Sequence, residues 1–238
     1  MAMLSNITRL LIDNCSFINQ PCLLCHGHKA INGLCQACQN SLLTLPAAHC
    51  PRCAEPVADG QLCGHCQRHP PAFDALHAPY VFGYPLDGLI HALKYGKRLE
   101  MAGVLGALMA DFTRQNGRKS DLVIPVPLAK ERLAERGFNQ SDELARAIAG
   151  TMQSCFSANL CWRKYNTSSQ ASLKRAARLK NVRDAFGVKR RLDGLCVAIV
   201  DDVATSGATL SALAETLKKQ GAKRVDAWVL AKAFHPKT

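Results

Sequence analysis

The segment that most constrains this chain lies near its end, in residues 196–210, CVAIVDDVATSGATL. Its apolar, β-branched start, Val197–Val200, predicts a buried parallel strand. Two acids, Asp201 and Asp202, follow this run, and a small polar loop then leads into a helical pattern that ends at Gly221. A strand, an acid pair, a loop and a helix in this order predict an α/β fold with a parallel sheet and flanking helices.

The loop and the start of the following helix are suited to binding an anion. Free backbone N–H groups and the positive end of the helix dipole favour phosphate there, and the hydroxyls add donors. The loop residues are Thr205, Ser206, Gly207, Ala208 and Thr209. The two carboxylates can accept hydrogen bonds from a ribose diol, directly or through Mg²⁺. We therefore expect a phosphosugar site. The alternative is an ordinary crossover with a capped helix. The segment has neither the GK[ST] of a Walker loop nor a GxGxxG fingerprint.

Cysteines dominate the other end of the chain, where eight of the twelve form four CxxC pairs separated by nine, eleven and nine residues. Each pair places two thiolates on one side of a tight turn, so two pairs make a closed four-sulfur site for structural zinc. The expected ligands are Cys22, Cys25, Cys35, Cys38, Cys50, Cys53, Cys63 and Cys66. We expect two zinc sites formed by sequential pairing, although the spacing also fits an interleaved pairing. Redox-active CxxC motifs are the alternative, and four copies argue against them.

Length and composition bound the remaining choices. A chain of 238 residues holds one substantial domain and a small one. The His69-Pro70-Pro71 segment suggests a boundary, with a double ribbon in residues 1–70 and the α/β domain in 71–238. No apolar run is long enough to span a bilayer, and the paired cysteines favour a reducing cytoplasm. The net charge of +12 fits nucleic acid or phosphorylated small molecules as ligands, and plain solubility would explain it equally well.

The middle of the chain carries further elements that bear on a site. Apolar periodicity predicts helices over 85–94, 101–115 and 142–149, and short strands over 79–84, 121–124, 159–162 and 225–231. Prolines belong at strand ends, so the Pro125-Val126-Pro127 turn should lie at the carboxyl edge of the sheet, where α/β proteins bind ligands. Arg132 and Arg136 follow it; their forked guanidinium groups suit diphosphate, with a solvated basic helix face as the alternative. The polar stretch 163–170, before an expected helix over 174–184, is either a lid or a surface loop.

Five motifs occur in one order: the four CxxC pairs, LIHALKYGK, VPL…R…RGFNQ, TSSQASLKRAARLKNVRDAF and VAIVDDVATSGATL. This order resembles the ComF/GntX family from about Cys22 to Ala231. The resemblance implies a double zinc ribbon joined to a type I phosphoribosyltransferase fold that takes phosphoribosyl pyrophosphate (PRPP). It also implies cytoplasmic roles linked to DNA uptake during competence, or to the use of external DNA as a nutrient.

The resemblance also implies roles for individual residues. Asp201 and Asp202 would contact ribose and Mg²⁺, and residues 205–209 would hold the 5′-phosphate of PRPP. The turn Pro125, Val126 and Pro127, together with Arg132 and Arg136, would face the pyrophosphate. Hood or lid residues would be Gln170, Arg178 and Asn181.

One position departs from the wider superfamily. Purine-salvage members often have an acid at the first loop position as a base toward the purine, whereas Thr205 stands here and cannot accept a proton near neutral pH. Either the acceptor needs no base there, or another residue supplies one, or PRPP binds without turnover.

Two functions therefore compete. The first is a PRPP-binding protein that acts as a transferase by displacing pyrophosphate at C1 of ribose. The second is a non-catalytic module that binds single-stranded DNA or a helicase-type partner, with a sensor or vestigial phosphoribosyl site. Single-strand binders interleave aromatic residues with cations. This chain is only 6% aromatic, although Tyr95, Phe138 and Tyr165 lie beside basic clusters.

Overall fold

The structure is a computed structural model, which describes residues 21–27, 30–96, 98–164 and 185–234. The chain forms two compact units, residues 1–41 and 42–238. The first cysteine quartet lies in the smaller unit. The second quartet lies in the same unit as the sheet. Among the described residues, no helix combines the length and the apolar character that crossing a membrane would require.

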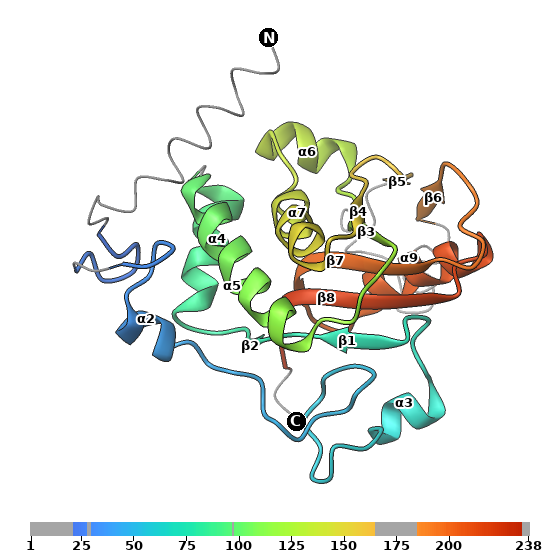
Figure 1. The fold of residues 1–238 in the computed structure, drawn as a ribbon, viewed down its shortest axis with the longest axis horizontal. Coiled ribbons are helices and arrows are strands. Elements are labelled where there is room, and N and C mark those ends of the chain that lie inside the picture. The colour runs from blue at the N-terminus through green and yellow to red at the C-terminus, as the bar shows by residue number, and fades with distance from the viewer. Residues whose placement is uncertain (1–20, 28–29, 97, 165–184, 235–238) are drawn as a thin grey trace, which may run out of the picture. The chain divides into compact units, whose positions relative to one another are not determined.

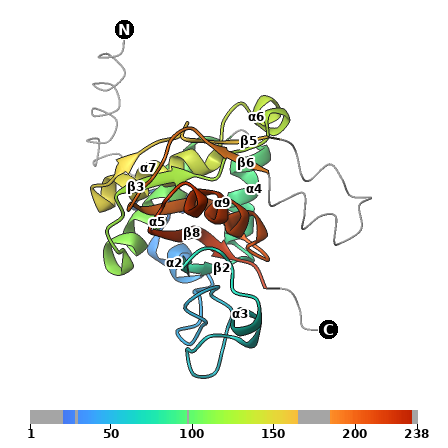
Figure 2. The same cartoon turned by 90° about the vertical axis from the view of Figure 1, so that its right-hand side faces the viewer.

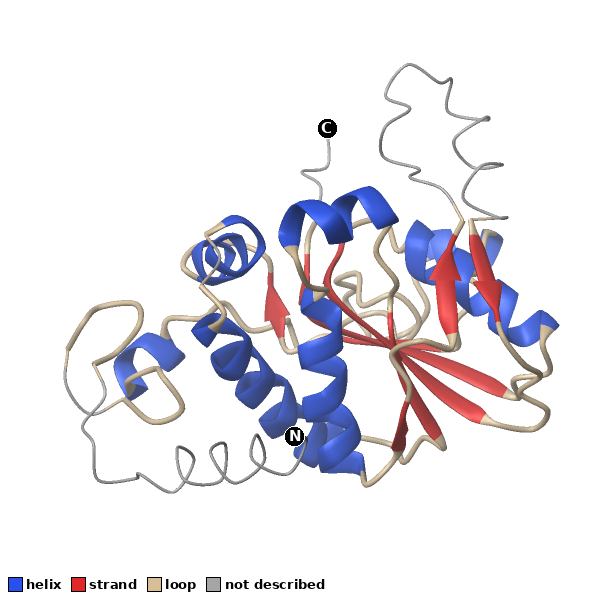
Figure 3. Ribbon diagram, turned by 90° about the horizontal axis from the view of Figure 1, so that it is seen from above, coloured by secondary structure: helices blue, strands red, loops and turns tan. Residues whose placement is uncertain are grey.

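The larger unit is built on a parallel sheet (Figures 1 and 2). Its strands are in the order β1-β8-β7-β3-β4, and β2 also pairs with β8. All of these pairs are parallel. The strands are β1 Ala75–His77, β2 Tyr80–Val81, β3 Leu122–Pro125, β4 Cys155–Phe156, β7 Cys196–Ala204 and β8 Arg224–Lys232. A separate antiparallel hairpin, β5 Cys161–Arg163 with β6 Phe186–Val188, stands beside the sheet (Figure 3).

Helices cover both faces of the sheet. Contacts place α5 and α7 against the strands on one side, and α9 packs against β6, β7 and β8. Figure 2 shows α9 in front of the sheet, with α5 and α7 on the far side. The helices of this unit are α3 Gly64–Arg68, α4 Leu86–Tyr95, α5 Glu100–Asn116, α6 Lys130–Arg136, α7 Gln140–Met152 and α9 Ala208–Lys219, and the smaller unit contains α2 Gln36–Asn40. This arrangement confirms the predicted fold class.

The two central strands carry the core because both of their faces are buried. In β7 the residues from Val197 to Val200 are at most 1% exposed, as expected for a strand covered by helices on both sides. The strand is longer than the apolar run predicts. It continues to Ala204 because Asp201, Val203 and Ala204 pair with residues of β8. The two acids therefore lie in the last part of a strand and do not follow its end.

The other predicted elements agree with the structure to within a few residues. The helices expected over 85–94, 101–115 and 142–149 correspond to α4, α5 and α7. The strand expected to end near Ile124 ends at Pro125, at the carboxyl edge of the sheet as predicted. The strand predicted over 159–162 corresponds to β5, which belongs to the hairpin. Strands β1, β4 and β6 and helices α2, α3 and α6 were not predicted. The expected helix over 174–184 lies outside the described residues.

Candidate functional site

The two predicted zinc sites are present as two groups of four thiols. The Sγ atoms of Cys22, Cys25, Cys35 and Cys38 lie within 4.8 Å of one another, and so do those of Cys50, Cys53, Cys63 and Cys66. The Sγ atoms of Cys25 and Cys35 are 3.7 Å apart, and those of Cys53 and Cys63 are 3.6 Å apart. Zinc–sulfur bonds of about 2.3 Å in a tetrahedron put the sulfur atoms about 3.8 Å apart, so both groups fit the ion. The pairing is sequential.

The first thiol of each quartet is placed for ionisation. Burial opposes the thiolate at Cys22 and at Cys50. Backbone N–H groups, led by those of Cys25 for Cys22 and of Cys63 for Cys50, nevertheless lower the two pKa values to about 6 and about 7. Thiolates are the form that binds zinc. Four ligands close each site, so the ions would be structural and not catalytic.

The acid pair at the end of β7 is held by two neighbouring residues of α7. Gln140 donates from Nε2 to Asp202 Oδ2 at 3.2 Å, and Ser141 donates from Oγ to Asp201 Oδ1 at 2.9 Å. Asn139 caps this helix by accepting a hydrogen bond from the Ser141 N–H. The end of the RGFNQ motif thus caps and begins α7. The first two residues of this helix, Gln140 and Ser141, reach the two carboxylates.

A lysine of α4 neutralises the more buried acid. Lys94 Nζ lies 2.7 Å from Asp202 Oδ2, and Asp202 is 4% exposed. The neighbouring Asp201 is affected differently. Burial, and then the charge of Asp202, raise the pKa of Asp201 to about 7, although Ser141 and Lys94 act in the opposite direction. Two carboxylates so close together repel each other, and a cation that bridges them would relieve the repulsion.

The predicted phosphate loop, residues 205–209, leads directly into a helix as expected. Gly207 has a φ of +74° and precedes α9, which begins at Ala208. The first N–H groups of a helix have no partner within the helix, so they are available to an anion. The hydroxyl of Ser206 accepts a hydrogen bond from the Ala208 N–H at 3.4 Å. At the other end, α9 stops at Lys219, and Gly221 then has a φ of +97°, as expected for a glycine after a helix.

Hydrogen bonds tie the Pro-Val-Pro turn to strand β7 and to Asn139, the residue that caps α7. Val126 donates its N–H to the carbonyl of Val200 at 2.8 Å, and its own carbonyl accepts from Asn139 Nδ2 at 3.1 Å. Pro125 pairs with Val200 as the last residue of β3, where its missing N–H costs the sheet little. The side chains of Pro125, Val126 and Pro127 are buried.

The two predicted arginines differ in how the structure places them. Arg136 donates from Nη1 to Gln140 Oε1 at 3.1 Å, so it is linked through Gln140 to Asp202, and its guanidinium lies 5.1 Å from the centre of the Tyr95 ring. Its Nε is buried without a hydrogen-bond partner among the described residues. Arg132 is linked to the site by the action of its charge on Arg163. Burial lowers the Arg163 pKa, the charge of Asp201 acts against this shift, and the charge of Arg132 adds to it.

An open pocket of about 690 Å³ adjoins the acid pair. One side is formed by Asp202, Val203 and Thr205 at the end of β7. Helix α4 also lines the pocket and contributes Asp87, His91, Lys94 and Tyr95, and Phe82 is a further lining residue. The rings of His91 and Tyr95 are 4.9 Å apart. Its volume is within the range of about 300–1,000 Å³ that is common for small-molecule sites.

Several of these residues were not among the predicted site residues. Lys94, His91, Ser141 and Arg163 enter the site only through the tertiary fold. Lys94 and His91 lie in the LIHALKYGK motif, which was the one signal that pointed to α4. The predicted lid residues Gln170, Arg178 and Asn181, and the aromatic residue Tyr165, lie outside the described residues.

Comparison with known proteins gives two matching domain families. The double zinc ribbon domain matches residues 17–67, and the phosphoribosyl transferase domain matches residues 104–237. The chain is 32% identical over 221 residues to the DNA utilization protein YhgH of Salmonella typhimurium, covering 90% of this chain and 97% of that protein. It is 31% identical to competence protein F of Haemophilus influenzae, covering 92% and 99% of the two chains.

Solved structures give a more distant likeness. The glutamine PRPP amidotransferase of B. subtilis, complexed with ADP and GMP, is 18% identical. The match has a TM-score of 0.42 and covers 59% of this chain and 30% of that one. With its two cysteine quartets, its parallel sheet and these full-length relatives, the chain belongs to the ComF/GntX family.

Proposed function

We propose that the chain binds PRPP together with Mg²⁺ at the carboxyl edge of its sheet. The observation that carries this proposal is the position of the acid pair Asp201 and Asp202 at the end of β7. A loop with a left-handed glycine and a free helix start follows directly after it. The 5′-phosphate would lie on residues 205–209, where N–H groups and hydroxyls meet the positive end of α9. The ribose hydroxyls would lie against the two carboxylates.

The residues present fit a magnesium ion. Mg²⁺ prefers oxygen ligands, and Asp201 and Asp202 offer carboxylate oxygens at one place. Bound there with PRPP, the ion would neutralise charge on the pyrophosphate leaving group. Lys94 already neutralises Asp202 at 2.7 Å. Lys94 would therefore balance part of the negative charge of the acid pair before the ligand binds. When the ion binds, the ion pair between Lys94 and Asp202 would have to break, or Asp202 would have to contact both cations.

Arg136 suits the pyrophosphate end of the ligand. A buried guanidinium N–H that has no partner is costly, and a phosphate oxygen would satisfy it. The Arg136–Gln140 contact would hold this donor in place before the ligand binds. Negative charge grows on the pyrophosphate as its bond to C1 of ribose breaks, and a positioned arginine stabilises that charge.

The pocket beside α4 supports a proposal that the chain also transfers the phosphoribosyl group to an acceptor. It adjoins Asp202 and Thr205, so a ribose held at the acid pair would turn one of its faces toward the pocket. The aromatic rings of Phe82 and Tyr95 suit a planar acceptor. His91 supplies a proton-accepting group that Thr205 lacks. We infer that a nitrogen heterocycle is the acceptor and that His91 is its base.

The test is a calorimetric titration of the zinc-loaded protein with PRPP and Mg²⁺. An Asp201→Asn/Asp202→Asn double variant should lose more than about 90% of its affinity, because two close carboxylates are replaced by neutral amides. Its zinc content should not change. The matched control is Asp111→Asn, an exposed acid paired with Arg114 on α5, which should bind normally. Absence of binding to the unmodified protein, or equal binding by the double variant, would overturn the proposal.

A second function is favoured by the names of the relatives and by the net charge of +12. We infer a role in DNA use, through contact with single-stranded DNA or with a DNA-processing partner. Of the aromatic residues beside cations, Phe138 is half-buried, whereas Tyr95 is 53% exposed and lies against Arg136, so Tyr95 is the better stacking platform of the two. A salt-titrated binding curve with single-stranded DNA decides between direct contact and a partner. No affinity at low salt would exclude direct contact.

A further inference from the structure

Lys232, the last residue of β8, is a buried cation beside the phosphate loop. Its side chain is 7% exposed, and its ammonium donates to the carbonyl oxygens of Thr205 and Ala233, each at 2.8 Å. Thr205 is the first residue of the phosphate loop. None of the functions considered so far uses Lys232. A lysine is rarely buried to this degree without a specific partner, because removing an ammonium from water is costly.

The partner comes from the turn that follows the first two cysteines of the second quartet. Glu55 Oε2 lies 3.7 Å from Lys232 Nζ. Within the described part of the chain, it is the only carboxylate that forms an ion pair with this lysine. Glu55 follows the zinc ligand Cys53 by two residues. The ion pair therefore joins a zinc knuckle to the end of β8, and the lysine joins that end to the phosphate loop.

The knuckle holds Glu55 in place through its backbone. The carbonyl of Glu55 accepts the N–H of Cys50 at 2.8 Å, and Ala54 donates its N–H to the carbonyl of Cys50 at 2.8 Å. Ala54 is fully buried and belongs to the hydrophobic core of the larger unit. Zinc bound to Cys50 and Cys53 would fix this turn, and with it the starting point of the Glu55 side chain.

The contact with Thr205 determines where the loop amides point. In a planar trans peptide the carbonyl oxygen and the following N–H lie on opposite sides of the bond. Because Lys232 holds the carbonyl of Thr205, the N–H of Ser206 is turned away from Lys232. If this peptide rotated, the loop would present a carbonyl oxygen where a phosphate needs a donor. A fixed orientation prepares the loop to bind an anion before the ligand arrives.

We propose that the knuckle Cys50–Glu55 positions the phosphate loop through Glu55 and Lys232, so that the affinity of the loop for phosphate depends on the second zinc site. Lys232 is then a positioning residue that does not touch the ligand. The proposal concerns the same site as the proposed function and rests on it for the identity of the ligand. The link itself is a property of the protein without ligand.

Two measurements on Glu55→Gln test the link. The first is hydrogen exchange of the Ala208 amide without ligand, since this loop N–H donates to Ser206 Oγ, and the second is the dissociation constant for PRPP and Mg²⁺. Loss of the ion pair should speed this exchange and weaken PRPP binding, each by about two- to fivefold. Zinc content should stay unchanged. The matched control is Asp59→Asn, which removes an acid from the same ribbon. Asp59 caps the turn at Gln61 and has no contact with Lys232 among the described residues, so both readouts should keep their original values.

A double-mutant cycle makes the test independent of PRPP. Lys232→Met should speed exchange of the Ala208 amide at least as much as Glu55→Gln, and adding Glu55→Gln to Lys232→Met should change it no further. Amides of β7 report whether the Met variant remains folded. Additive effects, or unchanged loop exchange in Glu55→Gln, would overturn the link. If the unmodified protein failed to bind PRPP while the cycle showed coupling, the proposed function would fail and the link would stand.

Discussion

The two zinc ribbons have nearly the same internal construction and very different surroundings. In the first, Cys22 donates its N–H to the carbonyl of Gly27 at 2.8 Å; in the second, Cys50 donates to Glu55 at the same distance. A short helix, α2 or α3, follows the third cysteine of each quartet. The same spacing of ligands thus produces the same turn twice, as expected where a metal determines the local fold.

The difference lies in what the residues between and after the cysteines contact. In the second ribbon Ala54 is part of the hydrophobic core of the larger unit, and Arg52 lies 3.6 Å from Asp74, just before β1. The first ribbon belongs to a compact unit of its own, residues 1–41. Two copies of one metal motif therefore serve different purposes. One stabilises a small separate unit, and the other is a structural part of the unit that contains the candidate site.

The largest expected effect comes from removing one zinc ligand from each ribbon in turn. Cys53→Ser should lower the free energy of unfolding of the larger unit by more than about 3 kcal/mol, because the turn that carries Ala54 and Glu55 loses its metal. Cys25→Ser should leave that unit unchanged. Denaturant unfolding followed by Trp228 fluorescence measures the difference, since this side chain is fully buried in β8.

The fluorescence measurement requires Trp228 to be the only tryptophan. The chain has two tryptophans, and Trp162 is 43% exposed, so Trp162→Phe should be the background for both variants. Zinc content should fall from two ions to one in each variant. Equal shifts of the unfolding midpoint in the two variants would contradict the comparison, because they would show that the second ribbon supports the sheet no more than the first does.

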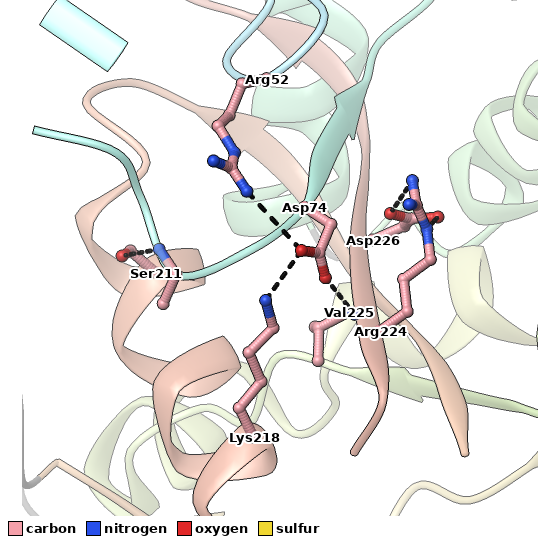
Figure 4. Close-up of polar contacts among 8 residues, drawn as sticks. Arg52, Asp74, Ser211, Lys218, Arg224, Val225 and Asp226 are labelled. Carbon is pink, nitrogen blue, oxygen red and sulfur yellow. Dashed lines mark hydrogen bonds and ion pairs between the residues drawn. The ribbon is translucent and has the colours of Figure 1, made fainter. Parts of the chain in front are cut away.

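A smaller effect is expected at Asp74, which ties the second ribbon to the sheet. Figure 4 shows its carboxylate between Arg52 and Lys218 of α9, with Lys218 Nζ at 2.8 Å and the N–H of Val225 donating at 2.8 Å. Asp74→Asn keeps the shape and removes the charge. It should cost about 1–2 kcal/mol at neutral pH. The exposed acid Asp111 is the control, and its change to Asn should leave the unfolding midpoint unaltered.

The stabilisation that Asp74 contributes should be lost as the pH falls. Burial acts against ionisation, but Lys218 and the N–H of Val225 outweigh it, so the pKa of Asp74 is lowered in the folded protein. A lowered pKa means that the stabilisation is fully present above the unfolded value of about 3.9 and is lost as the pH falls through the folded value. The difference between the unmodified protein and Asp74→Asn should therefore shrink below about pH 4. A difference that grew in acid would show that the charge of Asp74 is not what stabilises this contact.

The sequence predicted the parts of the molecule that depend on local pattern. The cysteine spacing predicted both quartets, and the run around Val197–Val200 predicted the central strand and the loop after it. In each case the chemistry of neighbouring residues is enough: thiols two residues apart form a knuckle, and a β-branched run flanked by turn residues forms a buried strand. The sequential pairing of the quartets was the first expectation and is confirmed.

Contacts between residues distant in sequence were not predictable in this way. Lys94 meets Asp202 across more than one hundred residues, and Lys232 meets Glu55 across a larger gap. Lys94 stands in a basic segment that suits an ordinary solvent-facing cation, whereas Lys232 ends an apolar strand, and in both cases only the fold brings the lysine to its acid. Strands β1 and β4 were missed because two or three residues show no periodicity, and pairing with a longer neighbour defines them. The domain division at residue 70 stays a prediction.

The smallest predicted effect is a difference in amide protection between glycine substitutions at matching positions of the two knuckles. The backbone contributions are the same at both positions, so the difference reports the surroundings. His26 and Ala54 occupy the same place after the second cysteine, with φ of 58° and 60°. Each donates its N–H at 2.8 Å to the carbonyl of the first cysteine. Glycine at either position relieves left-handed strain of about 1 kcal/mol and adds freedom to the unfolded chain, and these two terms are common to both sites. They cancel when the two variants are compared.

What remains in that comparison is burial. His26 is exposed, whereas the methyl group of Ala54 is fully buried among core side chains. Losing one buried methyl costs about 1 kcal/mol, so protection of the Ala54→Gly amide should fall about fivefold relative to His26→Gly. Hydrogen exchange at these two amides, corrected for intrinsic rates, measures the ratio directly. A ratio near one would mean that the second knuckle is held by its metal alone and gains nothing from the core that encloses it.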